Sequence, residues 1–307
     1  MENLLSNKLI GEGKIMLTLS KIYVSLFVAL TSAASAQTPK VISADDPRPL
    51  ATISDRLEQL SHFSINYEDV RYEHSSDIVD VTATVLTAAQ KALAPPGTKI
   101  LVPKGAAVSV TATVNQEGRI ADFVALSSAL QSAVDGFNRG SNGGKYIGKA
   151  NGQTLLIEPS QYRNSFNQIV QATPVLSTPL SIDLRTRTGM ETLSLVVERL
   201  SQVAGKKVVI GTIPIRQMAT TNVTIGAERE PAGSLLLRLF SAMGGNNLLS
   251  TNSPIVSYRL FFDPKQQYYV LNIHALPRGL PAAPGIDVPT PVVPPGQNPY
   301  FLLTPAK

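Results

Sequence analysis

The feature that most constrains this chain is a helical pattern that occurs twice, 143 residues apart. Residues 50–69 read LATISDRLEQLSHFSINYED, and residues 193–211 read LSLVVERLSQVAGKKVVIG. Both segments follow the pattern L-x-x-[IV]-x-[DE]-R-L-x-Q-[LV] and then enter a short β-rich run. A chain that carries one such unit twice is expected to fold as a repeat.

Apolar residues spaced three or four apart predict that each copy starts with an amphipathic helix. In the second copy Gly205 is expected to end this helix, because glycine adopts the left-handed conformation without a Cβ clash. Residues 207–211 then read as a buried strand. Glu198 and Arg199 lie off the apolar stripe, so we interpret them as solvated helix surface rather than as catalytic groups.

The rest of the second copy predicts the order β–α–β–β–α–β–β. Residues 180–184 form the lead strand, and the alternating residues 220–225 form a half-buried strand. Pro231 is expected at the first position of the second helix, where its missing N–H costs nothing. Two further strands are expected at residues 256–262 and 267–273.

The first copy follows the same order with a longer connection between its helices. Its second helix is expected at residues 120–137, followed by a hairpin that turns at Asn151-Gly152. The connection holds two similar strand-like segments, VDVTATV at 79–85 and VSVTATV at 108–114. We interpret it as an inserted excursion, with a short helix at 87–93 as an alternative.

These patterns predict an α+β fold of two small α/β modules of βαββαβ type, packed as a tandem repeat. The expected boundaries are a signal peptide at 1–36, a linker at 37–48, the first domain at 49–160 with an inserted segment at about 86–118, a linker at 161–179, the second domain at 180–276, and a proline-rich tail at 277–307.

Residues 16–37 contain the parts of a secretory signal peptide. Lys21 supplies a positive start, residues 22–30 are apolar, and Ala34-Ser35-Ala36 is a cleavage signal. The apolar run is short for a transmembrane helix, which needs about 20 residues, although a retained N-terminal anchor is the alternative. We predict an exported protein, periplasmic or associated with the outer membrane, cleaved near Ala36/Gln37, with no membrane span in the mature chain.

Composition excludes several classes of function. The chain has no cysteine, so disulfides, thiolate zinc sites and cysteine nucleophiles are excluded. A net charge of +5 over 307 residues, without a cluster of basic residues, argues against nucleic-acid binding. The three histidines are scattered, and no nucleophile or zinc motif is present. We predict a protein that is not an enzyme and has no cofactor.

The second copy, with its L-x-x-V-x-E-R-L-x-Q-x-A-G helix, KVVI strand, TNVTI strand and LLLRLFSAMG helix, resembles the secretin and TonB short N-terminal domain. The resemblance covers residues 180–275 well and 49–160 more loosely. It implies a module that acts through protein–protein contacts, and it supplies no functional residue. A chain that ends at residue 307 lacks the barrel of a secretin or receptor, so the resemblance implies a freestanding protein.

The polar segment 66–80, NYEDVRYEHSSDIVD, is the best candidate for a specific site. We single out Tyr67, Glu68, Asp69, Tyr72 and Asp77 as a possible polar or interaction site. Acid clusters can bind metal or serve acid–base chemistry, so an exported hydrolase is one alternative. A charged, solvated loop is the simpler interpretation.

The expected function is that of an adaptor or assembly factor in the cell envelope, which binds other envelope proteins through exposed sheet edges. The alternative is a protein that binds cell-wall or other polymers in a cleft between the copies. That cleft would be lined by Tyr67, Tyr72, Tyr146 and Tyr162. The sequence leaves the partner and the oligomeric state open.

Overall fold

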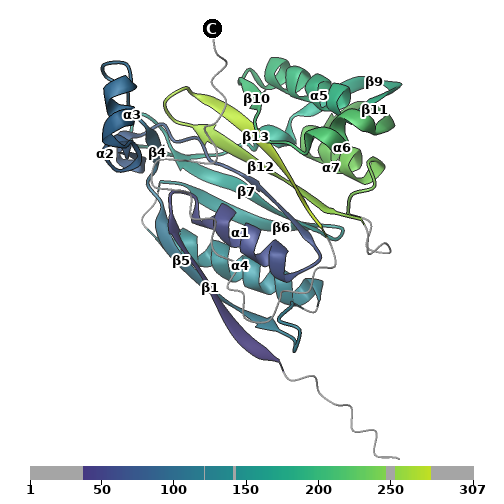
Figure 1. Ribbon diagram of the computed structural model, residues 1–307, viewed down its shortest axis with the longest axis horizontal. Helices are drawn as coiled ribbons and strands as arrows, with labels where there is room; N and C mark the ends of the chain where they lie inside the picture. Colours follow the sequence, from purple (N-terminus) through teal and green to yellow (C-terminus); the bar gives the residue numbers. More distant parts are fainter. Residues whose placement is uncertain (1–36, 121, 141–142, 247–252, 278–307) are drawn as a thin grey trace, which may run out of the picture. The chain divides into compact units, whose positions relative to one another are not determined.

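The computed structural model describes residues 37–120, 122–140, 143–246 and 253–277 (Figure 1). The predicted signal peptide and almost all of the proline-rich tail lie outside these residues. The described chain is mixed α/β, with seven α-helices and several sheets. None of these helices has the length and apolarity needed to cross a membrane.

The N-terminal half consists of two helices and five main strands. These elements are β1 (Thr38–Asp46), α1 (Pro49–Leu60), β2 (Ser64–Glu68), β5 (Ala106–Val114), α4 (Phe123–Arg139), β6 (Lys145–Asn151) and β7 (Thr154–Arg163). Strands β1 and β5 form an antiparallel pair. Strand β7 pairs with β2 in parallel and with β6 in an antiparallel hairpin. The hairpin confirms the predicted turn, in which Gly152 adopts φ 58°.

The C-terminal half has the corresponding elements and pairings. These elements are β9 (Pro179–Thr188), α5 (Gly189–Ala204), β10 (Val208–Ile210), β11 (Asn222–Pro231), α7 (Ala232–Ala242), β12 (Ile255–Asp263) and β13 (Tyr268–Leu276). Strands β9 and β11 form an antiparallel pair. Strand β13 pairs with β10 in parallel and with β12 in an antiparallel hairpin. Gly205 ends α5 in the left-handed conformation at φ 61°, as predicted.

Short elements fill the connections. They are η1 (Ser75–Asp77), β3 (Ile78–Asp80), α2 (Thr82–Val85), α3 (Ala88–Leu93) and β4 (Leu101–Pro103) in the N-terminal half, β8 (Ile169–Gln171) and η2 (Val175–Ser177) between the halves, and α6 (Ile215–Thr220) in the C-terminal half. Strand β3 pairs with β4, and β8 pairs with β7.

The helices of the N-terminal half pack between two sheets. Helix α1 contacts β1 and β2, and α4 contacts β5 and β6; Figure 1 shows both helices between these strands. The helix periodicity places the buried core on the faces toward the strands, and the leading members are Ile53, Leu57, Leu126 and Leu130. In β5, valines and alanine at even positions are buried while odd positions are exposed, as expected for a strand with one covered face.

One continuous sheet joins the two halves. Its strand order is β10-β13-β12-β2-β7-β6, and β12 of the C-terminal half pairs in parallel with β2 of the N-terminal half. Arg259 lies opposite Tyr67 in this register, and Leu260 lies opposite Glu68. A strand pair between elements about 190 residues apart has no local signature, so the sequence patterns did not predict it.

Three sequence interpretations differ from the structure. Residues 37–48, expected as a linker, contain β1, whose partner β5 lies in the segment expected to be inserted. Only Ile42 and Ala44 of β1 are buried, so the segment has little apolar periodicity and looked like a linker. Residues 79–85 form the end of β3 and the helix α2 rather than one strand, whereas the alternative helix at 87–93 is present as α3.

Helix α4 begins at Phe123 rather than Ile120, because Asp122 caps it by accepting a hydrogen bond from the N–H of Ala125. Pro231 is the last residue of β11 and precedes α7 rather than starting it. Both differences concern only element boundaries.

Candidate functional site

The predicted polar residues around position 69 form a buried network. The Asp69 carboxylate is fully buried and accepts hydrogen bonds from Arg48 Nε at 2.6 Å, Tyr67 Oη at 2.6 Å and the N–H of Phe262 at 3.0 Å. The hydroxyls of Tyr72 and Tyr146 lie 3.1 Å apart in the same network. Every oxygen of Asp69 is therefore used by groups of this chain.

Burial governs the ionisation of this network. Desolvation and the charge of Asp69 raise the pKa of Tyr67 and Tyr72 well above the usual value of a tyrosine. These tyrosines therefore stay neutral and donate hydrogen bonds, while Arg48 supplies the counter-charge of Asp69. Such a hydrogen-bonded network stabilises the protein interior. Tyr67 and Tyr72, which stay neutral, are therefore not ionised as bases or nucleophiles.

Glu68 holds the connection between the two halves. One carboxylate oxygen accepts a hydrogen bond from the N–H of Val175 and the other accepts from the N–H of Leu176 at 3.1 Å. Burial raises the pKa of Glu68 to about 8, against the lowering effect of these two N–H groups. Both N–H groups belong to η2, so Glu68 is a structural acceptor at the entrance to the C-terminal half.

Asp77, the fifth predicted residue, has different partners. Its carboxylate lies 3.7 Å from Arg163 Nε, and its backbone oxygen accepts a hydrogen bond from the N–H of Lys104. It is also largely buried, at 8% exposure. Within the described ranges, no group of three or more acids and histidines has a geometry that could hold a metal ion.

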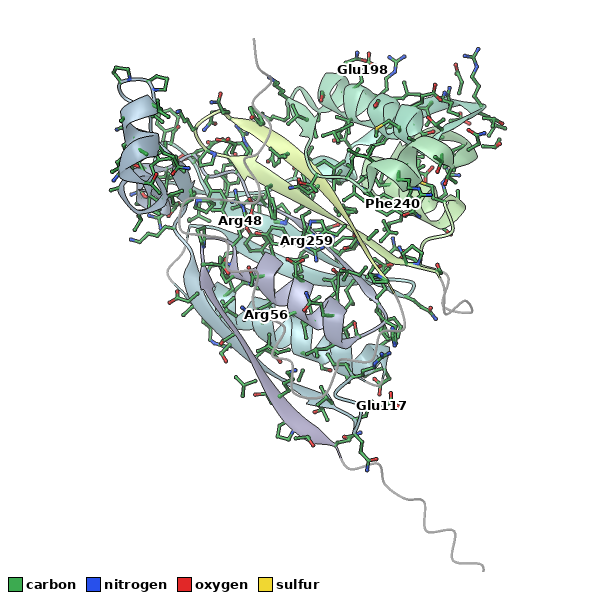
Figure 2. The ribbon with its side chains drawn as sticks, in the orientation of Figure 1. Arg48, Arg56, Glu117, Glu198, Phe240 and Arg259 are labelled. Carbon is green, nitrogen blue, oxygen red and sulfur yellow. The ribbon has the colours of Figure 1, made fainter. Side chains whose placement is uncertain are left out.

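The strongest polar feature that the sequence did not indicate is Arg259 of β12. Its side chain is fully buried, and Nη2 donates to Asp55 at 2.7 Å and to Glu58 at 2.8 Å. Its Nη1 donates to the backbone oxygen of Ile65, next to the β2–β12 pair. Figure 2 shows Arg259 and Arg48 in the interior. Arginine in the run SYRLFF looks like an ordinary strand residue, so only the fold identifies its role.

Glu58 connects a helix to both strands at this junction. One oxygen accepts from the N–H of Ile65 at 2.6 Å, and the other binds Arg259 and Ser257 Oγ. Burial raises the pKa of Glu58 to about 7, and Arg259 opposes this rise. The matched position in the second helix, Ser201, accepts a hydrogen bond from the N–H of Val208 at 3.0 Å.

Glu198 and Arg199, which the sequence places on the helix surface, are exposed on α5. Glu198 accepts a hydrogen bond from Gln202 Nε2 at 3.1 Å, and Arg199 donates to the same glutamine. Figure 2 shows Glu198 on the outer surface of α5. The interpretation as solvated surface is confirmed.

A cleft of about 260 Å³ with both apolar and polar lining lies beside the buried network. Its walls come from β7, β8, the connection at 172–178, the end of α5 and β13. Arg71, Tyr162 and Lys206 supply its cationic and aromatic lining.

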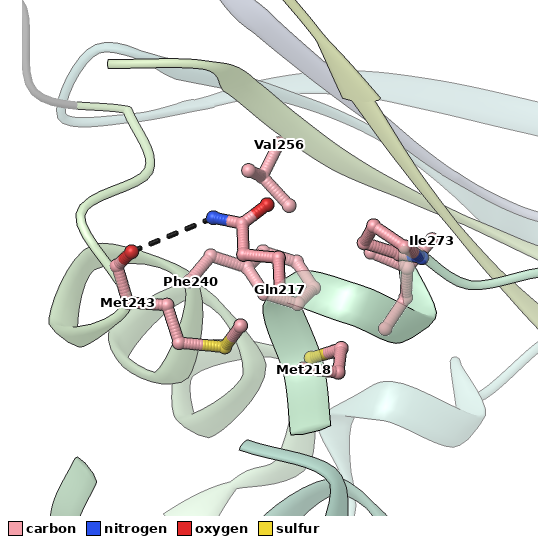
Figure 3. A pocket seen from close by; sticks show the side chains of 7 residues that line it. Gln217, Met218, Phe240, Met243, Val256 and Ile273 are labelled. Carbon is pink, nitrogen blue, oxygen red and sulfur yellow. Dashed lines mark hydrogen bonds between the residues drawn. The ribbon is translucent and has the colours of Figure 1, made fainter. Parts of the chain in front are cut away.

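A second depression, in the C-terminal half, is apolar (Figure 3). It is lined by Pro214, Gln217, Met218, Phe240, Met243, Val256 and Ile273. It has no room for a water molecule, and the Gln217 amide donates to the backbone oxygen of Met243 across it at 3.5 Å. We interpret it as a packing gap between α6, α7 and the sheet rather than as a ligand site.

The ends of the joined sheet are poorly suited to bind another strand. Strand β10 has three residues, and Ser201 Oγ bonds both the N–H and the carbonyl of Val208. On β6, the Asn138 amide bonds the N–H and the carbonyl of Tyr146. A short edge strand and backbone groups that are already hydrogen-bonded both disfavour pairing with a strand of another chain.

Most strands outside the joined sheet are protected as well. Strand β1 carries Pro39, and its Ser43 carbonyl accepts a hydrogen bond from Arg56. The β9–β11 pair has two register irregularities and several charged side chains. Proline, bulges and charges all disfavour the addition of a further strand.

Strand β5 lacks these protective features. Its sequence, AAVSVTATV, contains no charge and no proline, and it pairs regularly over nine residues with β1. Pro39 has no N–H and the Ser43 carbonyl is bound elsewhere, so β1 uses its even residues for the ladder. Residues 107, 109, 111 and 113 of β5 lie opposite the odd residues of β1, so they direct their backbone groups away from β1. Within the described ranges no strand pairs with this second edge.

Comparison with family models, with curated proteins and with solved structures found no match for this chain.

Proposed function

We propose that this chain is an exported envelope protein without catalytic activity, built from two modules that resemble the secretin and TonB short N-terminal domain. The equal element order and strand pairing of the two halves support a tandem repeat. So do two paired details. Glu58 and Ser201 accept hydrogen bonds from the N–H groups of Ile65 and Val208, which are matched residues at the starts of the following strands. Asn138 and Asn246 each bond both backbone groups of a strand residue.

The observation that carries the proposed activity is the open edge of β5. A nine-residue strand with unpaired backbone groups, high β-propensity and no charge accepts an extended segment of another protein. Backbone hydrogen bonds supply the affinity in this mode, and exposed side chains such as Ser109 and Thr111 adjust the specificity. We propose that β5 adds a strand from another envelope protein, as an adaptor or assembly factor would.

Site-specific photo-crosslinking in cells tests this proposal. A photoreactive residue at Ser109 should give a crosslinked product with an envelope protein. The same residue at Thr224, an exposed position on the protected β11 strand, is the matched control and should give none. Thr111→Lys should remove the product, because a lysine on an edge disfavours strand addition. Equal products from both positions, or no product from Ser109, would contradict the proposal.

The alternative of a polymer-binding surface loses its support. Tyr67, Tyr72 and Tyr146 are buried at 2%, 7% and 1% exposure, and their hydroxyls face Asp69. Only Tyr162 is partly exposed. The hydrolase alternative is weakened in the same way, because Glu68 and Asp69 are occupied by internal hydrogen bonds.

A further inference from the structure

The cleft beside the Asp69 network has the properties of a small binding site. Its volume of about 260 Å³ is just below the range of roughly 300–1,000 Å³ that is typical of ligand pockets. Pro159, Tyr162, Pro174, Val175 and Tyr269 provide apolar and aromatic walls. Gln171, Thr173 and Thr178 add neutral polar groups. A cleft that combines apolar walls with polar groups suits a small organic molecule.

The charges around the cleft leave one excess positive charge. Asp69 is paired with Arg48, and Arg71 is paired with Glu73 at 2.7 Å. Lys206 has no carboxylate within ion-pair distance among the described residues. A ligand with a single negative charge would balance this excess.

Arg71 also has hydrogen-bonding capacity that the described residues do not use. Its Nε is buried and has no hydrogen-bond partner within the described residues, although Nη2 binds Glu73. Buried donors in folded proteins are nearly always paired, so an unpaired guanidinium N–H needs an acceptor. The guanidinium carbon lies 5.8 Å from the centre of the Tyr162 ring, which also lines the cleft.

We propose that this cleft binds the carboxylate of a small organic anion, with Arg71 and Lys206 as the groups that recognise it. The planar guanidinium matches a carboxylate in shape, and the lysine adds a point charge. The single excess charge favours a monoanionic carboxylate over a dianionic phosphate. The proline and tyrosine walls would contact an apolar part of the same molecule.

Titrations of the exported chain, followed by NMR and calorimetry, test the site. The probes are benzoate, N-acetyl-alanyl-phenylalanine, the C-terminal amide of that dipeptide, and inorganic phosphate. We expect at least one carboxylate to bind and to shift the Tyr162 signals, while the amide and phosphate do not. Stronger binding of benzoate would indicate a free small acid, and stronger binding of the dipeptide would indicate a peptide C-terminus.

Two variants and one matched control decide the roles of the residues. Arg71→Met and Lys206→Met should each weaken binding about tenfold or more, the usual effect of losing a hydrogen bond to a charged group. Lys207→Met removes the same charge one residue away, where the ammonium lies over Tyr268, and should leave binding unchanged. Circular dichroism checks that each variant is folded. Failure of both carboxylates to bind the folded wild-type chain, or unchanged binding by the folded Arg71→Met and Lys206→Met variants, would overturn the site.

Discussion

At the scale of single residues, buried charges and polar groups explain most of the unusual side chains of this protein. Glu68 and Asp69 look like members of a polar site in the sequence, and Arg259 looks like an ordinary strand residue, yet each is bonded to buried groups of the fold. A charge inside a protein is stable only when it is paired and hydrogen-bonded. The same principle makes a buried titratable residue sensitive to pH.

His274 of β13 is such a residue. Burial, and then the charge of Arg259, lower its pKa to about 4, whereas an unfolded histidine titrates near 6.5. The folded state therefore binds the proton less well, and its stability should fall as the pH drops from about 6.5 to 4. The total effect is on the order of 3 kcal/mol, at 1.4 kcal/mol per pKa unit.

Urea denaturation at pH 7 and pH 4.5 measures this effect in wild type and in His274→Gln. The variant should lose less stability between the two pH values, because glutamine does not titrate. Carboxylates that titrate in the same interval contribute equally to both proteins, so the difference isolates the histidine. An identical loss in both proteins would show that His274 is not the sensitive group.

At the scale of elements, two asparagine side chains bond the backbone at the starts of the hairpin strands β6 and β12. The Asn138 amide of α4 bonds the N–H of Tyr146 at 2.9 Å and its carbonyl at 2.7 Å. Asn246 forms the same pair of bonds with Val256 at 2.8 Å each. These amides replace a missing neighbouring strand at the start of each hairpin.

Asn138→Ala should lower the free energy of unfolding by about 1–3 kcal/mol, because it leaves two partly buried backbone groups without partners. Gln131→Ala on the same helix is the control. Its amide bonds only the exposed Asp135, so the change should be within about 0.5 kcal/mol. Urea denaturation compares the two variants. Equal effects would mean that the Asn138 amide does not stabilise β6.

Most helices and strands could be predicted from the sequence, but the pairing of strands that are far apart in the chain could not. The spacing of Leu193, Val196 and Leu200 predicted α5 because a helix buries residues three and four apart. The hairpin turn at Gly152 was predicted from the same local information. The pairing of β1 with β5 was missed, because half of β1 is polar and its partner lies about 70 residues away.

The candidate site shows the same limit. The sequence placed Tyr67, Glu68, Asp69 and Tyr72 close together, since they are neighbours in the chain. It did not reveal that Arg48, Tyr146 and Phe262 bind Asp69, or that Arg71 and Lys206 line one cleft. These relationships depend on segments brought together by the joined sheet, and no periodicity records them.

At the scale of the whole molecule, the β2–β12 pair makes the two halves depend on each other. The ion pairs of Arg259 with Asp55 and Glu58 lie at this junction, and the Arg259 side chain is fully buried. The matched helix positions in the second copy are Glu198 and Ser201, so the acidic pair is specific to the junction.

Arg259→Met should destabilise the chain by about 3–5 kcal/mol, since removing the arginine leaves the buried Glu58 carboxylate without its counter-charge. Arg238→Met removes an arginine whose ion pair with Glu230 is half exposed and should cost about 1 kcal/mol or less. Guanidinium denaturation gives both values. Amide hydrogen exchange at Tyr67 reports whether the β2–β12 pair opens first. A loss no larger than that of Arg238→Met would contradict a stabilising role for the junction.

The position of this junction in the chain also determines the order in which the protein can be completed. Synthesis proceeds from the N-terminus, so β2 leaves the ribosome about 190 residues before β12. Until then Asp69 lacks the N–H of Phe262, and Glu58 lacks Arg259. The N-terminal half therefore carries an unfinished edge until β12 is synthesised, and unpaired strand edges make partly folded chains prone to aggregation. The β12–β13 hairpin, the last among the residues that the structure describes, is the element that closes the first half.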